Sequence, residues 1–284
     1  MPVTAGDRRE ERRGRMHLAT DLLYRSLRLF TDHIQNFRAA VGVFLIAGAA
    51  VAVAGVWLFA ILAIDVRQGA TQAFDDAVMT YLGQHRIAWI ERSLIEITAL
   101  GTGLVVIVIV AIAATFLSLT RHRYSALLLL VSTGGGIILN NILKLIFNRD
   151  RPQVFEWLAH ASSSSFPSGH AMSAAIVYAT IGYLAARLQR RRWARWLTMF
   201  LAFCMIVLIC ISRLYLGVHY PSDVAAGVVL GLAWAAFCMA ALEAIQVLGR
   251  RRSAQMAQDE EPPPSTAEPT AAPIAVLPVE ADRA

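Results

Sequence analysis

The sequence predicts an all-α membrane protein with six transmembrane helices. Of its 284 residues, 57% are hydrophobic and only 16% are charged, a composition too apolar for an ordinary soluble domain. The hydrophobic residues also gather in blocks close to the length of about 20 residues that a helix needs to cross a bilayer. These blocks cover residues 39–64, 94–119, 124–147, 169–187, 195–212 and 222–248.

The same pattern divides the chain into three segments. Residues 1–38 are basic, and apolar residues recur at helical spacing in their second half, which indicates an amphipathic helix on the inner leaflet or, alternatively, a soluble cap helix. Residues 39–248 hold the six blocks and form the transmembrane domain. Residues 249–284 turn to Pro, Ala, Glu and Ser, which predicts a disordered cytoplasmic tail.

Arginines beside the blocks predict how the helices are oriented. Outside the basic N-terminal segment they are Arg121, Arg123, Arg187, Arg190, Arg191, Arg192, Arg195, Arg250, Arg251 and Arg252. If the six helices alternate in direction, all of these lie on one side, which the positive-inside rule places in the cytoplasm together with both termini. We therefore interpret the net charge of +6 as a topology signal and not as a nucleic-acid-binding surface.

The pattern also indicates a location. No cleavable signal peptide is expected, because the first apolar block is too long for the core of one. An uncleaved first helix and arginine-rich loops suit a bacterial inner membrane. The loops opposite the arginines would then face the periplasm or the exterior.

A shorter helix is predicted in the first outside loop, residues 65–93. Phe74, Val78 and Tyr81 recur there at helical spacing, and Asp75 and Asp76 lie on the other face. This pattern favours a short helix at the membrane interface.

Polar side chains at membrane depth are costly and are functional by default. One group of them ends the third block, where Lys144 precedes Arg151 by seven residues. A second group, Ser168, Gly169 and His170, opens the fourth block. Ser168 is the predicted N-cap, and the free amides of a helix N-terminus bind anions. Taken singly, the lysine also fits a side chain that extends to the interface, and the second group fits a simple capped helix start.

The third group joins the fifth and sixth blocks and contains Arg213, His219 and Asp223. A carboxylate four residues from a histidine can hold the ring in one tautomer. By itself this group also fits an ordinary solvated loop. Alternation of the helices, however, places all three groups on the same membrane face, opposite the arginine-rich loops.

Together the three groups contain the parts of a phosphoryl-transfer site. Three cationic side chains can neutralise a phosphoryl group. His219 can attack as the nucleophile with Asp223 orienting it, and His170 can protonate the departing oxygen. No cluster of carboxylates indicates a metal site, and Cys204, Cys210 and Cys238 have no metal-ligand spacing. Neither a metal nor another cofactor is therefore expected.

The same residues resemble the signature motifs of the type 2 phosphatidic acid phosphatase (PAP2) superfamily. The matching segments are Lys144-x6-Arg151-Pro152, Pro167-Ser168-Gly169-His170 and Ser212-Arg213-x5-His219-x3-Asp223. The resemblance implies a PAP2/haloperoxidase-like helical bundle that hydrolyses phosphate esters without a metal through a phosphohistidine.

By this resemblance the phosphate is bound by Lys144, Arg151, Ser168, Gly169 and Arg213. His170 is the acid, His219 the nucleophile, and Asp223 its partner. The substrate class is a lipid phosphate or pyrophosphate, such as phosphatidic acid, phosphatidylglycerol phosphate or undecaprenyl pyrophosphate. Two alternatives are a vanadium haloperoxidase-like enzyme and a non-catalytic membrane protein that binds lipid headgroups.

Overall fold

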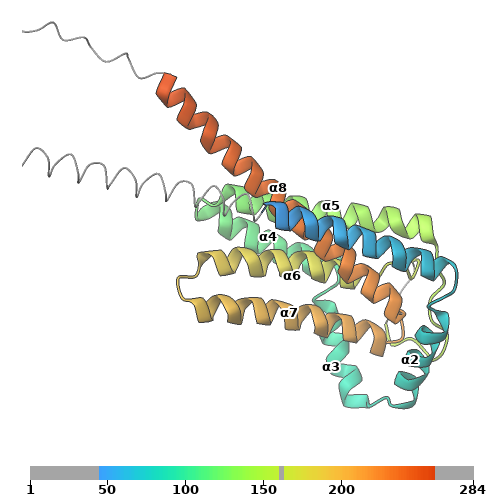
Figure 1. The fold of residues 1–284 in the computed structure, drawn as a ribbon. Helices are drawn as coiled ribbons and strands as arrows, with labels where there is room; N and C mark the ends of the chain where they lie inside the picture. The colour runs from blue at the N-terminus through green and yellow to red at the C-terminus, as the bar shows by residue number, and fades with distance from the viewer. Residues whose placement is uncertain (1–44, 160–162, 260–284) are drawn as a thin grey trace, which may run out of the picture. The chain divides into compact units, whose positions relative to one another are not determined.

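The computed structural model describes residues 45–159 and 163–259, and within these ranges every regular element is an α-helix (Figure 1). The first span, Leu45–Arg67, is followed by seven helices. They are α2 (Gln72–Gln84), α3 (Ala88–Ala99), α4 (Gly103–Leu119), α5 (Arg123–Phe147), α6 (Gly169–Leu188), α7 (Arg192–Tyr215) and α8 (Pro221–Asp259). The amphipathic helix expected before residue 39 lies outside the described residues.

The chain separates into two units, Met1–Ala244 and Ile245–Ala284, and the helix bundle and the candidate site belong to the first. Within the second unit, α8 continues to Asp259. Residues 249–259 are therefore helical, where a disordered tail was expected. The sequence Arg-Arg-Ser-Ala-Gln-Met-Ala-Gln at residues 251–258 consists mostly of good helix formers, and no proline follows Pro221 before residue 262.

Five described helices are long and apolar enough to span a membrane, and α3 with α4 makes a sixth span if the bent pair is counted as one. The two helices meet at 51° across a break at residues 100–102, within the continuous block predicted for residues 94–119. The break frees carbonyl groups that need new donors at membrane depth. The Tyr178 hydroxyl donates to the Leu100 carbonyl at 3.0 Å, and Thr102 Oγ1 donates to Ala99 at 2.7 Å.

Helix α6 lies at the centre of the bundle. Over half of its spanning window is buried (56%), compared with 11% for the first span, whose side chains mostly face outward. Glycines in α8 allow close packing against α6. A Cβ on Gly227 would lie 2.6 Å from the Ser168 carbonyl oxygen, and one on Gly231 would lie 2.8 Å from the Met172 carbonyl oxygen. Such small residues let membrane helices approach closely, and here they position the N-terminus of α6.

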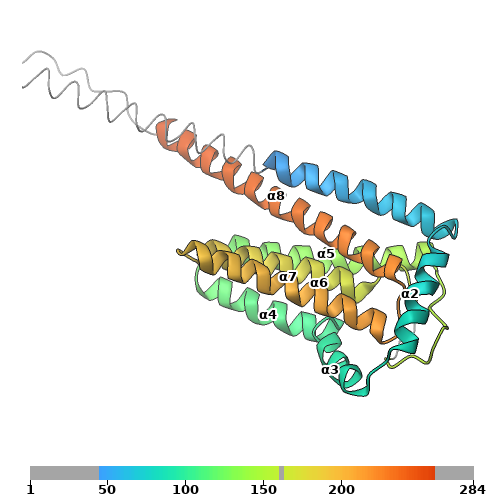
Figure 2. The same ribbon diagram turned by 60° about the horizontal axis from the view of Figure 1, so that its bottom comes forward.

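The connections alternate between the two ends of the bundle, as predicted. The arginine-rich α4–α5 and α6–α7 connections lie at one end (Figures 1 and 2). The α5–α6 and α7–α8 connections lie at the other end, together with α2 and α3. The three polar groups singled out in the sequence are therefore at the same end of the bundle.

Candidate active site

The predicted nucleophile lies in the turn before α8, and the start of that helix explains its geometry. Pro221 is the first helical residue, where its missing N–H costs nothing. Asp223, in the first turn, reaches back and accepts from the Tyr220 amide at 2.9 Å, which is half of a capping box. Its Oδ2 atom also lies 3.6 Å from Nδ1 of His219 and accepts from Ser165 Oγ at 2.5 Å.

The protonation state of His219 follows from these surroundings. With Nδ1 beside the carboxylate, Nε2 is the ring atom left for chemistry, and it faces Nη1 of Arg151 at 3.3 Å. His219 is only 1% exposed, and this burial lowers its pKa to about 4; Asp223 opposes the shift, whereas Arg213 and Arg151 add to it. At neutral pH the imidazole is therefore uncharged, and its Nε2 lone pair is available for attack.

Three cations of the predicted site lie close to His170 and to one another, and one of them, Arg151, faces His219. Lys144 Nζ donates to Ser163 Oγ at 2.8 Å, and Arg151 Nε donates to the Ser163 carbonyl at 2.8 Å. None of Lys144, Arg151 and Arg213 forms an ion pair within the part of the chain that the structure describes. Lys144 and Arg151 are half-buried and Arg213 is buried, so this group of unneutralised charges favours a bound anion.

Arg213 shows this most clearly. It is 3% exposed, and its Nη1 donates to Thr98 Oγ1 of α3 at 2.8 Å. Its Nε is buried and has no hydrogen-bond partner among the described residues. An unpaired buried donor costs about 1–3 kcal/mol, more when charged, so this N–H fits an incoming oxyanion.

The N-terminus of α6 completes the site. Ser168 is the N-cap, as predicted, with its Oγ accepting from the Ala171 amide at 3.5 Å. The amides of Gly169 and His170 follow in the first turn and have no intrahelical acceptor. A Cβ on Gly169 would lie 3.0 Å from Asn140 Oδ1, so only glycine fits there without a shift. Free amides at a helix N-terminus favour an anion.

His170 occupies the first turn of α6, beside the break between α3 and α4. A Cβ on Gly101 would lie 3.2 Å from its Cδ2 atom, so the break makes room for the ring. His170 interacts electrostatically with Arg213, His219, Lys144 and Arg151. The structure therefore brings all eight predicted site residues to one place.

Other polar residues at the site were missed by the sequence reasoning. Arg149 donates to both Asp75 and Asp223, Ser165 donates to Asp223, and Thr98 holds Arg213. Arg149 stands beside Arg151 in the sequence, but no pattern linked it to a carboxylate 74 residues earlier. Thr98 lies within an apolar block and gave no signal.

The short helix predicted within residues 65–93 is α2. Phe74 and Tyr81 are exposed, as suits a helix at the membrane interface, whereas Asp75 is fully buried. Periodicity identified the two faces and could not tell which one faces the bundle. The acidic face turns inward because Arg149 and Ser222 supply hydrogen-bond donors to Asp75.

Comparisons with known proteins show which family this chain resembles. Residues 125–246 match the model of the PAP2 superfamily. The chain is 37% identical to phosphatidylglycerophosphatase B of Bacillus subtilis (strain 168), over 61% of this chain and 86% of the relative. It is 28% identical to an undecaprenyl-diphosphatase of Sulfolobus acidocaldarius, over 66% of this chain and 88% of the relative.

A solved structure gives the same result for the fold. The crystal structure of a transmembrane PAP2-type phosphatidylglycerolphosphate phosphatase from Bacillus subtilis superposes with a TM-score of 0.63 at 34% identity, covering 66% of this chain and 94% of that one. The segment that matches the PAP2 model, residues 125–246, contains all eight predicted site residues. With its membrane-spanning helices and this degree of similarity, the chain belongs to the PAP2 superfamily and is an integral membrane phosphatase of that type.

Proposed function

We propose that this lipid phosphatase works through a phosphohistidine on His219, at the outer face of the membrane. The observation that carries the proposal is the arrangement around Nε2 of His219. The imidazole is uncharged, and Asp223 lies beside Nδ1 on the other side of the ring. Arg151 faces Nε2, and it belongs to a group of three cations that lack carboxylate partners among the described residues. This arrangement suits a nucleophile facing a bound phosphoryl group.

In the first step, Nε2 attacks phosphorus, and the bond from phosphorus to the lipid oxygen breaks. Lys144, Arg151 and Arg213 neutralise the phosphoryl oxygens, with the first-turn amides of α6. With the anionic phosphate bound among these cations, His170 carries a proton from the solvent. It gives this proton to the departing oxygen, which leaves as the lipid alcohol or, from a diphosphate, as the monophosphate.

In the second step, water attacks the phosphohistidine. His170, now neutral, accepts a proton from the water, and the phosphorus–nitrogen bond breaks to release inorganic phosphate. Asp223 holds the Nδ1 proton throughout and stabilises the charge that develops on the ring. The enzyme returns to its starting state with no redox partner.

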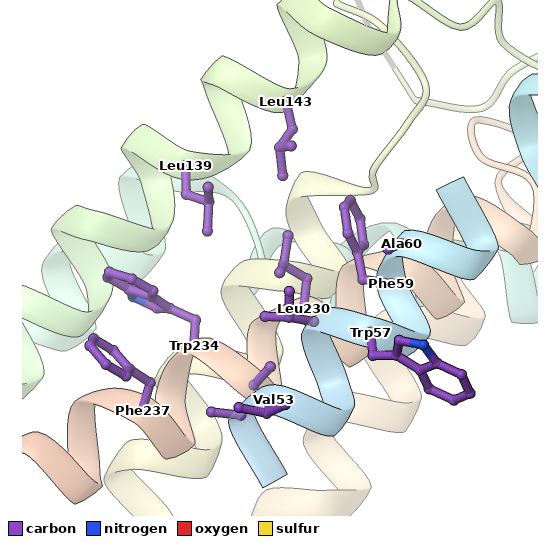
Figure 3. Close-up of a pocket in the computed structure, with 12 residues that line it drawn as sticks. Val53, Trp57, Phe59, Ala60, Leu139, Leu143, Leu230, Trp234 and Phe237 are labelled. Atoms are coloured by element: carbon purple, nitrogen blue, oxygen red, sulfur yellow. The ribbon is translucent and has the colours of Figure 1, made fainter. Parts of the chain in front are cut away.

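An apolar groove supports the lipid part of the proposal. It has a volume of about 840 Å³ and lies between the first span, α5 and α8, lined only by apolar side chains (Figure 3). Leu143, one of its lining residues, directly precedes Lys144, and Phe59 stacks on Phe166 at 5.8 Å, two residues before the α6 N-cap. A hydrocarbon chain in the groove therefore ends close to the cations.

The names of the relatives suggest two substrate classes for testing. One relative is a phosphatidylglycerophosphatase and another an undecaprenyl-diphosphatase. We propose phosphatidylglycerol phosphate as the first candidate, because the relative with this name shows the higher identity of the two. The outer-face location rests on the arginine-rich connections at the opposite end of the bundle, and it suits a bacterial inner membrane.

The test is release of inorganic phosphate in detergent from phosphatidylglycerol phosphate, phosphatidic acid and undecaprenyl diphosphate. We expect turnover by the wild type, none by His219→Gln, and wild-type rates from His122→Gln, an exposed histidine at the opposite end of the bundle. Turnover by His219→Gln would refute the nucleophile. Phosphate binding without turnover by the wild type would favour the headgroup-binding alternative, and halide oxidation with bound vanadate would favour the haloperoxidase one.

A further inference from the structure

A series of buried charges connects α2 to the carboxylate that holds His219. Asp75 of α2 has no exposed surface, and its Oδ2 accepts from Nη2 of Arg149 at 2.9 Å. Nη1 of the same guanidinium donates to Oδ1 of Asp223 at 2.6 Å. Arg149 therefore bridges two carboxylates, and the second of these carries His219 on its other oxygen.

Asp75 also fixes the helix that carries Asp223. The Ser222 amide donates to Asp75 Oδ1 at 3.0 Å, and the Ser222 hydroxyl donates to Oδ2 at 2.5 Å. A carboxylate from α2 thus caps the first turn of α8, where the two helices lie side by side (Figure 2). The Tyr220 ring covers the Arg149 guanidinium at 4.4 Å.

Arg149 has little donor capacity left for a phosphate. Its Nη1 donates to Ser222 Oγ and Asp223 Oδ1, and its Nη2 donates to Gln72 Oε1 and Asp75 Oδ2. Arg151 differs, because it is paired with no carboxylate among the described residues and faces Nε2 of His219. This contrast argues against Arg149 as a fourth phosphate ligand.

We propose that Arg149 and Asp75 are positioning residues. They hold Asp223 against His219, and they determine the net negative charge that lies beside the imidazole. The inference rests on the function proposed above. Two carboxylates and one guanidinium leave one net negative charge in the network. If Asp75 were neutral, Arg149 would cancel Asp223, and His219 would lose the anionic partner that stabilises its charged, phosphorylated form.

The other charged groups around His219 stay constant in this comparison. They are Lys144 of α5, Arg151 of the α5–α6 connection, His170 of α6 and Arg213 of α7. A change at Asp75 or Arg149 thus acts on the imidazole through Asp223. The direction of the resulting shift in the His219 pKa depends on whether the negative charge of Asp75 or the positive charge of Arg149 is removed.

The test combines kinetics with ¹⁵N NMR titration of the His219 imidazole in detergent. For Asp75→Asn we expect kcat to fall about 10- to 100-fold, the size of effect known for outer-shell partners of histidine ligands in metal sites. KM and inhibition by vanadate, a phosphate mimic, should stay within about threefold, and the His219 pKa should fall. For Arg149→Gln the His219 pKa should rise, because Asp223 then acts on the ring without a competing cation.

Glu91→Gln is the matched control. It removes the Arg86–Glu91 ion pair, which has no contact with His219 or Asp223, and it should leave kcat and the titration unchanged. If Arg149→Gln does not fold, the double variant Asp75→Asn/Arg149→Gln removes both charges, and the His219 titration is measured in that variant instead. Its pKa should lie nearer the wild-type value than that of Asp75→Asn.

Three results would overturn the inference. They are an unchanged kcat and titration in both single variants, shifts of the same sign in both, and a loss of vanadate affinity in Asp75→Asn as large as its loss of kcat. Failure of the proposed function looks different, because the wild type itself would then lack turnover or a phosphohistidine. The two failures are therefore distinguishable.

Discussion

Arg149 and Arg151 are two residues apart in the same connection, yet their surroundings differ completely. Arg149 contacts two buried carboxylates, a serine and a glutamine. Arg151 donates to backbone carbonyls, faces the His219 ring, and belongs to a group of cations that lack carboxylates. The site therefore has a neutralised part, which holds Asp223 beside His219, and an unneutralised part, which can bind an anion. The positions of Arg149 and Arg151 in the sequence do not distinguish their roles, whereas the atoms that each guanidinium contacts do.

The largest effect should come from removing charge in the unneutralised part. Arg151→Gln removes one stabilising donor from the transition state, which typically costs about 10²–10³-fold in rate. We expect kcat/KM to fall by that factor and vanadate inhibition to weaken, while thermal unfolding stays near the wild-type temperature because no ion pair is lost. Steady-state kinetics and thermal unfolding measure the two quantities.

The same substitution in the neutralised part should act mainly on stability. Arg149→Gln leaves Asp75 buried without its cation, and breaking a buried ion pair typically costs about 3–5 kcal/mol. A lowered unfolding temperature for Arg149→Gln and not for Arg151→Gln would sharpen the comparison. Equal losses of stability in both variants would contradict it.

The groove provides a third prediction, separate from the charges. Ala60→Trp fills part of the apolar groove and should raise KM for a long-chain lipid about tenfold, the equivalent of roughly two methylene contacts. Hydrolysis of a water-soluble phosphate ester should not change. Ala54→Trp, on the same span and outside the groove lining, serves as the control. An equal effect on both substrates would count against a chain-binding groove.

A smaller effect is expected at the support of Arg213. Thr98→Val keeps the shape of the side chain and removes the hydrogen bond to Nη1. One net hydrogen bond is worth about 0.5–1.5 kcal/mol, so vanadate affinity should fall about 2- to 10-fold. Ser93→Val on the same helix is the control, because Ser93 is exposed and donates only to the Trp89 carbonyl. Unchanged vanadate affinity in Thr98→Val would show that α3 does not position Arg213.

The pH dependence follows from the His219 pKa of about 4. Below pH 6.5, the ordinary pKa of histidine, the His219 imidazole binds a proton in the unfolded chain but stays neutral in the folded chain. Folding stability therefore falls as pH drops from 6.5 toward 4. Above 6.5 this group contributes nothing. NMR titration of the free enzyme should find His219 neutral at pH 5.5, and a His219 midpoint near 6.5 would contradict the account.

Much of this fold could be predicted because hydrophobic length and arginine placement constrain membrane helices strongly. The eight candidate site residues could be proposed because seven of them are polar exceptions at the ends of apolar blocks and the eighth, Gly169, stands between two of these. The break between α3 and α4 was missed, since residues 94–119 read as one block and the donor from Tyr178 that relieves the break comes from another helix. The inward turn of Asp75 was missed for the same reason, because its partners Arg149 and Ser222 are remote in the sequence.

Trapping the phosphoenzyme tests the central claim most directly. His170→Gln should still be phosphorylated by an ester with a good leaving group, such as p-nitrophenyl phosphate, and should release the phosphate slowly for lack of a base. After an alkaline quench, peptide mapping should locate an acid-labile, alkali-stable phosphate on His219, absent when His219→Gln is added. An acid-stable phosphate, or one on any other residue, would contradict the account.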